Sequence, residues 1–189
     1  MLTWSERRRM KRELRLLDKK MDAAQIFDAA QHYYTDREYI ACVSDILENP
    51  VFRSMGNYIM HGNTTCRTHC IDVSYFSYNV AKKLGLNAKA CARAGLLHDM
   101  FLYDWHDHIR TTGNYFHGLT HPRVAMNNAS KNFSLSRMER DIILKHMWPL
   151  TVVPPKYKEG LVVCYADKYC CVAEVLRRLS HRFRRALSA

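Results

Sequence analysis

Apolar residues recur at helical spacing along most of the chain. Near the N-terminus, four of them at i, i+4, i+7 and i+11 predict an amphipathic helix with basic outer faces: Met10, Leu14, Leu17 and Met21. Segment 22–49 continues as helix until the chain reaches Pro50. The same spacing predicts further helices over about 65–84, 87–98, from Pro122 onward, 136–146 and 159–179.

Residues that favour helix ends support these boundaries. Gly85 stands where a C-terminal cap is expected, and Asn87 stands where the next helix needs an N-cap. Ser136 and Glu139 have the spacing of a capping box. Pro122 suits the first turn of a helix, where its missing N–H is tolerated.

The remaining pattern indicates one all-α domain. Segment 55–65 contains two glycines and is predicted to be a loop, and no segment alternates for long enough to build a sheet. A chain of 189 residues with 48% hydrophobic and 25% charged residues is typical of a single globular domain. No apolar run approaches the ~20 residues that a membrane span requires. We therefore expect a basic helix over 1–20, packed on a single domain over 21–189.

The net charge of +11 is concentrated at the two ends of the chain. Residues 1–20 hold eight Lys or Arg and three Asp or Glu, which gives +5, and residues 177–189 hold five Arg and no acid, which gives another +5. A nearly neutral body argues against a dedicated nucleic-acid groove. Solvated helix faces are the simpler interpretation, and weak contact of the basic termini with polyanions such as RNA or anionic lipid is the alternative.

The cysteines and the N-terminal residues give information on the subcellular compartment. Seven cysteines are an odd number, they form no C-x-x-C pair, and most have apolar neighbours. The first twenty residues stay charged throughout and lack the layout of a signal peptide. These features predict a reduced, cytoplasmic protein.

Candidate chemistry begins at the stretch "AGLLHD", where an apolar helix ends in His98 and Asp99. Histidine or aspartate also shares the apolar face of three other predicted helices, and one histidine stands beside Pro122: His69, His146, Asp167 and His121. Each of these histidines taken singly is more often a satisfied core residue. Together, imidazoles and carboxylates that point into one core need a positive charge between them, which predicts one or two divalent metal ions.

A second pair, His106 and Asp107, lies in an irregular polar stretch and is interpreted as the rim of the site. Aromatic residues flank the same stretch, where they could stack on a base or plug the end of the bundle: Phe101, Tyr103, Trp105, Tyr115 and Phe116.

The order of these residues resembles the HD superfamily of metal-dependent phosphohydrolases over roughly residues 60–180. The resemblance implies an HD-domain helical bundle with the metal site in its core. It implies one ion held by His69, His98, Asp99 and Asp167. It also implies a second ion held by His121 and His146, with Asp99 bridging the two ions. Imidazole and carboxylate ligands favour Fe, Mn, Zn or Ni over Mg or Ca.

The resemblance also implies hydrolysis of a phosphate ester, in a nucleotide or a related phosphorylated small molecule. Two ions would lower the pKa of a bridging water, and the resulting hydroxide would attack phosphorus. Asp99 and His98 are the predicted catalytic residues. Cationic residues near the predicted ligands are candidates for binding the phosphate: Arg67, Arg123, Lys145 and Lys168.

The chain departs from two branches of the family. Leu102 occupies the position where many cyclic-dinucleotide enzymes carry lysine, and no Gly-Tyr-Pro signature follows His146. Hydrolysis of cyclic di-GMP is therefore not predicted, and the chain resembles a stand-alone catalytic domain. Two alternative functions have the same residue pattern: an HD-fold di-iron oxygenase, and a metal- or nucleotide-binding module without catalysis.

Overall fold

A computed structural model describes residues 32–61, 64–105 and 116–187, and four positions nearer the N-terminus: Ser5, Arg8, Arg9 and Arg12. The rest of the predicted helix over 1–20 lies outside the described residues, so its packing on the domain stays a prediction. His106, Asp107 and Tyr115 lie outside them as well.

The described residues form a helical bundle, which confirms the all-α prediction. The helices in chain order are α3 (Arg37–Leu47), α4 (Pro50–Ser54), α5 (Cys66–Lys83), α6 (Ala88–Leu97), α8 (His117–Asn132), α9 (Arg137–Lys145) and α10 (Lys158–Leu187). Two 3-10 turns, η1 (Tyr33–Thr35) and η2 (Met55–Asn57), precede α3 and follow α4. The segment predicted to be a loop also contains a small antiparallel pair, β1 (Ile59–His61) and β2 (Thr64–Thr65).

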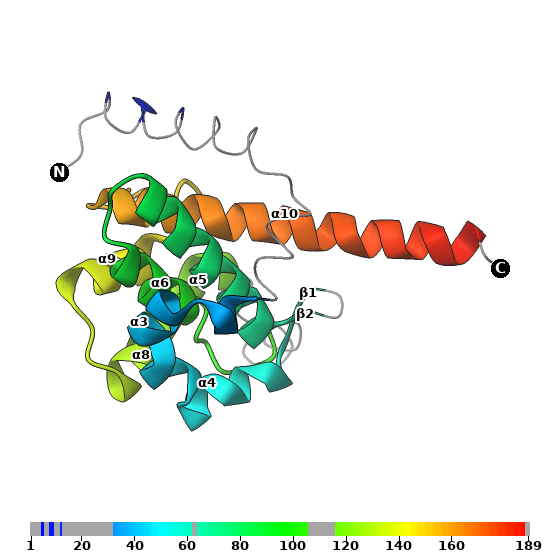
Figure 1. Cartoon of the computed structure of the whole chain (residues 1–189), viewed down its shortest axis with the longest axis horizontal. Coiled ribbons are helices and arrows are strands. Elements are labelled where there is room, and N and C mark those ends of the chain that lie inside the picture. The colour runs from blue at the N-terminus through cyan, green and yellow to red at the C-terminus, as the bar shows by residue number, and fades with distance from the viewer. Residues whose placement is uncertain are drawn as a thin grey trace.

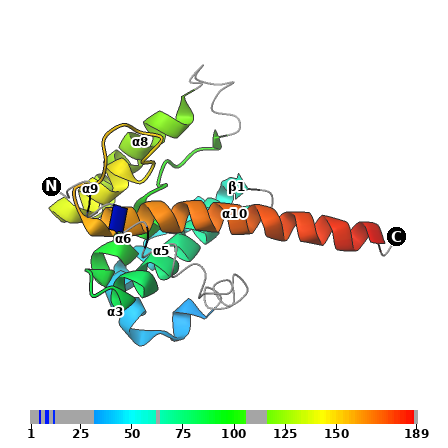
Figure 2. The same ribbon diagram turned by 90° about the horizontal axis from the view of Figure 1, so that it is seen from above.

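The helices pack around α5 and α6, which contact each other most extensively. α10 packs on both of them, and α3 and α9 cover other sides of α6. In both ribbon views α10 is the longest element, and its C-terminal part extends beyond the other helices (Figures 1 and 2). Its side chains Val172, Leu176 and Leu179 are exposed. Buried residues of α10 extend as far as Ala173 and Glu174, and the helix beyond them leaves the core.

A glycine sets the close approach of α5 and α6. A Cβ atom at Gly95 would lie 2.7 Å from the Cα of Ser74, which is too close for any side chain. The Ser74 hydroxyl donates to the Ala92 carbonyl across the same contact (2.7 Å). This contact fixes the C-terminal end of α6 beside α5.

The predicted helix caps are confirmed. The Asn87 side chain accepts a hydrogen bond from the backbone N–H of Ala90, and Gly85 has the positive φ of a left-handed cap (+63°). Ser136 and Glu139 form both hydrogen bonds of the capping box at the start of α9.

Three predicted helix boundaries are wrong. α8 begins at His117, so Pro122 is its sixth residue instead of belonging to its first turn. Helix is not continuous over 22–49, because Asp36 accepts a hydrogen bond from the N–H of Tyr39 and starts a new helix there. α10 continues to Leu187 instead of ending near residue 179. Of these three differences, the cap formed by Asp36 explains the break before α3.

Among the described helices, none is both long and apolar enough to cross a bilayer. All seven cysteines are free thiols, and five of them are buried.

Candidate metal centre

Five helices bring the predicted ligands to one place. α5 supplies one residue, the C-terminal end of α6 supplies two, and α8, the end of α9 and α10 supply one each: His69, His98, Asp99, His121, His146 and Asp167. All six side chains are buried, with exposed fractions of 0–7%. The structure thus groups every residue that the sequence singled out as a metal ligand.

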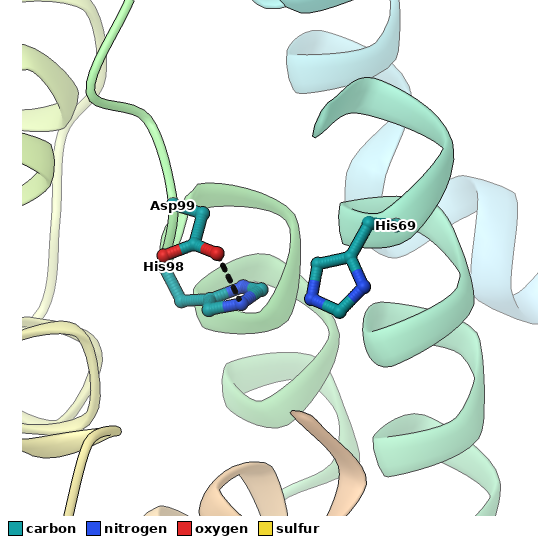
Figure 3. A group of neighbouring side chains, drawn as sticks. All are labelled: His69, His98 and Asp99. Carbon is teal, nitrogen blue, oxygen red and sulfur yellow. Dashed lines mark ion pairs between the residues drawn. The ribbon is translucent and has the colours of Figure 1, made fainter. Parts of the chain in front are cut away.

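One half of the cluster lies between α5, α6 and α10. The Nε2 atom of His69 lies 3.3 Å from Oδ1 of Asp167. The Nε2 atom of His98 lies 3.3 Å from Oδ2 of Asp99 and 3.7 Å from Oδ1 of Asp167. Figure 3 shows His69 on α5 with its ring turned toward His98 and Asp99 at the end of α6.

The other half lies on the opposite side of Asp99. Its Oδ1 atom lies 3.1 Å from Nε2 of His121 and 3.4 Å from Nε2 of His146. The two carboxylate oxygens of Asp99 therefore face two different groups of imidazoles. This is the arrangement of a carboxylate that can bridge two ions.

The outward-facing nitrogen of each imidazole is held in place. Three Nδ1 atoms lie against backbone carbonyl oxygens and one against a carboxylate: His98 against Gly95 (2.8 Å), His121 against His117 (2.9 Å), His146 against Ile143 (2.8 Å) and His69 against Glu174 (2.8 Å). Because a carbonyl oxygen can only accept, Nδ1 of those three rings carries the hydrogen. A neutral ring then directs the Nε2 lone pair toward the cluster, as a metal ligand must.

These donor atoms fit divalent ions. The Nε2 atoms of His121 and His146 are 2.8 Å apart, so two neutral rings would face each other lone pair to lone pair. The Nε2 atom of His98 and the Oδ1 atom of Asp99 are buried, and the groups 3.1–3.3 Å from them are not oriented to form hydrogen bonds with them. A cation between such atoms removes both penalties, and imidazole with carboxylate suits first-row transition ions.

The pKa values show how the cluster balances its charge with protons alone. Burial opposes a charge on His98, but Asp99 and Asp167 outweigh it and raise the pKa to about 10. Burial also opposes the charge of Asp99, but His98 and His121 hold the pKa of this carboxyl well below its usual value. Burial is likewise outweighed at His69, whose pKa is raised by Asp167 and Glu174, and at Asp167, whose pKa is lowered by His69 and His98. Protons on two histidines thus occupy the role that ions would take.

Two residues beside the centre escaped the sequence analysis. His117 lies on α8 with its ring 4.9 Å from that of His121, and its Nδ1 is 3.1 Å from the Tyr103 hydroxyl. The signal was the i, i+4 spacing of His117 and His121, which the misplaced helix start at Pro122 concealed. Glu174 follows Asp167 by two helical turns, a spacing that could have predicted a shared face.

The predicted phosphate-binding cations have different surroundings. Lys168 Nζ donates to the His146 carbonyl (3.3 Å) and lies 3.7 Å from Oδ2 of Asp167. Arg67 is half-buried and its Nε has no hydrogen-bond partner. Lys145 forms an ion pair with Asp141, and Arg123 is exposed.

The described aromatic residues beside α8 pack on one another. Phe101 is buried, with its ring 5.1 Å from those of Tyr103 and His117. The Trp105 ring stacks on His117 at 5.7 Å, whereas Phe116 is exposed. Apart from Phe116, these residues close one side of the cluster.

Comparison with protein families gives one match. The sequence profile of the HD domain matches residues 67–170, more than half of the chain, and this range contains all six clustered residues. The chain belongs to the HD domain family. Members of this superfamily are generally metal-dependent hydrolases, and the buried histidine and aspartate groups of this member can hold metal ions. Neither the curated proteins nor the solved structures give a match.

Proposed function

We propose that this HD domain hydrolyses a phosphate ester with two divalent transition ions, Fe, Mn, Zn or Ni. His69, His98, Asp99 and Asp167 would hold the first ion, and Asp99, His121 and His146 the second. The proposal depends on Asp99, whose Oδ2 lies 3.3 Å from one imidazole while its Oδ1 lies 3.1 Å from another. A bridging carboxylate is the feature that distinguishes a two-ion centre from a single site.

The ions would supply Lewis-acid activation of water and of the phosphate oxygens. The protein contributes a rigid, buried ligand set. Carbonyl acceptors on Gly95, His117 and Ile143 orient three imidazoles before anything binds, so little reorganisation is needed. The buried ring of Phe101 lies 6.0 Å from that of His121 and would limit access of water from that side.

The positions of two cationic side chains favour a phosphorylated substrate. Lys168 lies against Asp167 at the edge of the cluster, and Arg67 on the first turn of α5 has a guanidinium nitrogen without a partner. Both are placed to steady the charge of a phosphate group. Lys145 is a weaker candidate because its ion-pair partner, Asp141, is not one of the six clustered residues, and the exposed Arg123 would act only on the outer part of a substrate.

The test is a metal-reconstitution assay. Metal-depleted protein is reloaded anaerobically with Fe, Mn, Zn or Ni, and phosphate release is measured over a panel of nucleotides and small phosphate esters. Release that is abolished in Asp99→Asn and retained in Asp104→Asn, an exposed carboxylate nearby, supports the proposal. Oxygen consumption with iron and no phosphate release would instead identify an oxygenase. Tight nucleotide binding without turnover under every metal would identify a binding module.

We further propose that the protein works in the cytoplasm. Seven free thiols are typical of a reducing compartment. The five arginines of residues 177–189 and the basic residues of 1–20 would add weak contact with polyanions.

A further inference from the structure

Glu174 contacts His69, one of the candidate metal-ligating residues, from outside the centre. It lies on α10, and its Oε1 atom is 2.8 Å from Nδ1 of His69. The other ring nitrogen, Nε2, faces Oδ1 of Asp167 at 3.3 Å. Asp167 and Glu174 are seven residues apart on the same helix, so α10 contacts both nitrogens of this ring.

This contact differs from those of the other three histidines. His98, His121 and His146 each direct Nδ1 at a neutral backbone carbonyl. His69 alone among the four directs it at a carboxylate, and both side chains are almost fully buried, with exposed fractions of 1% and 3%. An anionic acceptor fixes the ring more strongly and makes the opposite nitrogen a better electron donor.

Burial of Glu174 needs an explanation in its own right. Its second oxygen, Oε2, is buried and accepts no hydrogen bond. An incompletely satisfied carboxylate costs stability unless its charge serves a purpose. The residue also lies beyond the matched family segment, which ends at residue 170.

Charge is distributed unevenly over the two halves of the centre. The half at His69 contains Asp167, shares Asp99 and has Glu174 behind it. The half at His121 and His146 only shares Asp99, and its rings are held by neutral carbonyls. A cation is therefore held by more negative charge in the first half.

We propose that Glu174 is a positioning residue that makes the His69 half of the centre the tighter ion site, so that the two ions bind in a fixed order. The inference rests on the proposed two-ion centre. Its carboxylate keeps Nδ1 of His69 protonated and Nε2 directed at the ion. The second ion then binds at His121 and His146 with lower affinity.

The test titrates Zn²⁺ into metal-depleted protein in competition with a fluorescent chelator, and elemental analysis gives the number of ions per chain. Glu174→Gln keeps the shape and an acceptor oxygen but removes the charge. It should weaken the tighter site about 10–100-fold and leave the weaker site unchanged. The matched control is Glu159→Gln, a buried carboxylate on the same helix that accepts from the N–H of Asn87, and it should change neither affinity.

The outcomes separate this inference from the proposed function. Absence of Zn²⁺ binding in the unaltered protein overturns the metal centre itself. Two bound ions with unchanged affinities in Glu174→Gln, or an equal loss at both sites, overturn the role of Glu174 alone. If Glu174→Gln does not fold, Glu174→Asp, which withdraws the charge from Nδ1, should show the same selective loss, and unchanged affinity there also overturns the inference.

Discussion

Two clusters of charged side chains are built around α6, one at Arg93 and one at His98 and Asp99. They differ in how far their charges are neutralised by ion pairs and hydrogen bonds within the cluster. In the first, Arg93 donates to Glu139 of α9 (2.9 Å), to Asp45 of α3 (2.6 Å) and to the Cys42 carbonyl (3.2 Å). The other carboxylate oxygen of Glu139 accepts from the N–H of Ser136 (2.6 Å). Opposite charges and hydrogen bonds thus satisfy this cluster from within.

The second cluster balances its charge only when two of its histidines, His69 and His98, carry an extra proton. Four imidazoles surround two carboxylates, Nε2 of His121 faces Nε2 of His146 at 2.8 Å, and Nε2 of His98 lies 3.3 Å from Oδ2 of Asp99 without forming a well-oriented hydrogen bond. Both clusters hold helices together, yet only the one at Asp99 has donor atoms directed at a shared point. Burial of charged groups alone therefore does not indicate a functional site. Buried nitrogen and oxygen atoms that point at one another without hydrogen bonds do indicate one.

The largest effect should come from the residue shared by both halves of the centre. Among the described residues, Asp99 is the one carboxylate that contacts imidazoles of both halves, so Asp99→Ala should release both ions. We expect phosphate release to fall about 10³-fold or more. Elemental analysis and the phosphate assay check this, and retention of two ions per chain would contradict it.

A substitution in the Arg93 cluster should lower the stability of the fold and leave the candidate metal centre intact. Arg93→Ala leaves Glu139 buried without its partner, and we expect a loss of roughly 3–5 kcal/mol in the free energy of unfolding. Urea denaturation measures it, with the exposed Arg137→Ala as the control. Folded Arg93→Ala protein should still bind two ions per chain, and loss of the ions would show that the clusters are coupled.

The next effect separates the halves of the centre. His121→Ala or His146→Ala removes a ligand from one half only, because their Nε2 atoms contact Asp99 and each other. Metal content should fall from two ions to one per chain. The exposed His32→Ala is the control, and two ions in both site variants would show that the second half binds no ion.

The smallest expected effect is a dependence of Zn²⁺ affinity on pH, which arises from the metal centre and not from the Arg93 cluster. The pKa values of His69 and His98 are raised, the latter to about 10, so at pH 7 the metal-free protein holds protons that an ion must displace. Zn²⁺ binding should release about two protons per chain and strengthen as pH rises. Calorimetry in buffers of different ionisation enthalpy measures this release.

The same shifts set the stability of the metal-free protein. A raised histidine pKa stabilises the fold fully below the unfolded value near 6.5, and for His98 this is lost as pH rises through about 10. The depressed pKa values of Asp99 and Asp167 stabilise the fold above about 3.9, and this is lost as pH falls below it. Thermal unfolding from pH 7 to 10 should show the first loss, and a flat profile would contradict it.

Much of the centre was predictable because most of its candidate ligands follow a local rule. His69 and Asp167 share faces with apolar residues of their own helices, and His98 with Asp99 ends an apolar helix. Periodicity therefore showed that these side chains point inward. Periodicity did not reveal His117, because Pro122 suggested a helix start that lies more than one turn after the actual start of α8.

The sequence by itself determined the helical class, the caps and the set of inward-facing histidines and aspartates, because these depend on residues within one or two turns of each other. Only the tertiary structure decided that Asp99 faces two groups of imidazoles and that Glu174 supports His69 across 105 positions of sequence. Such contacts depend on the angle and spacing of packed helices, for example the close approach that Gly95 permits to Ser74. That geometry is a property of the whole core, and no local pattern contains it.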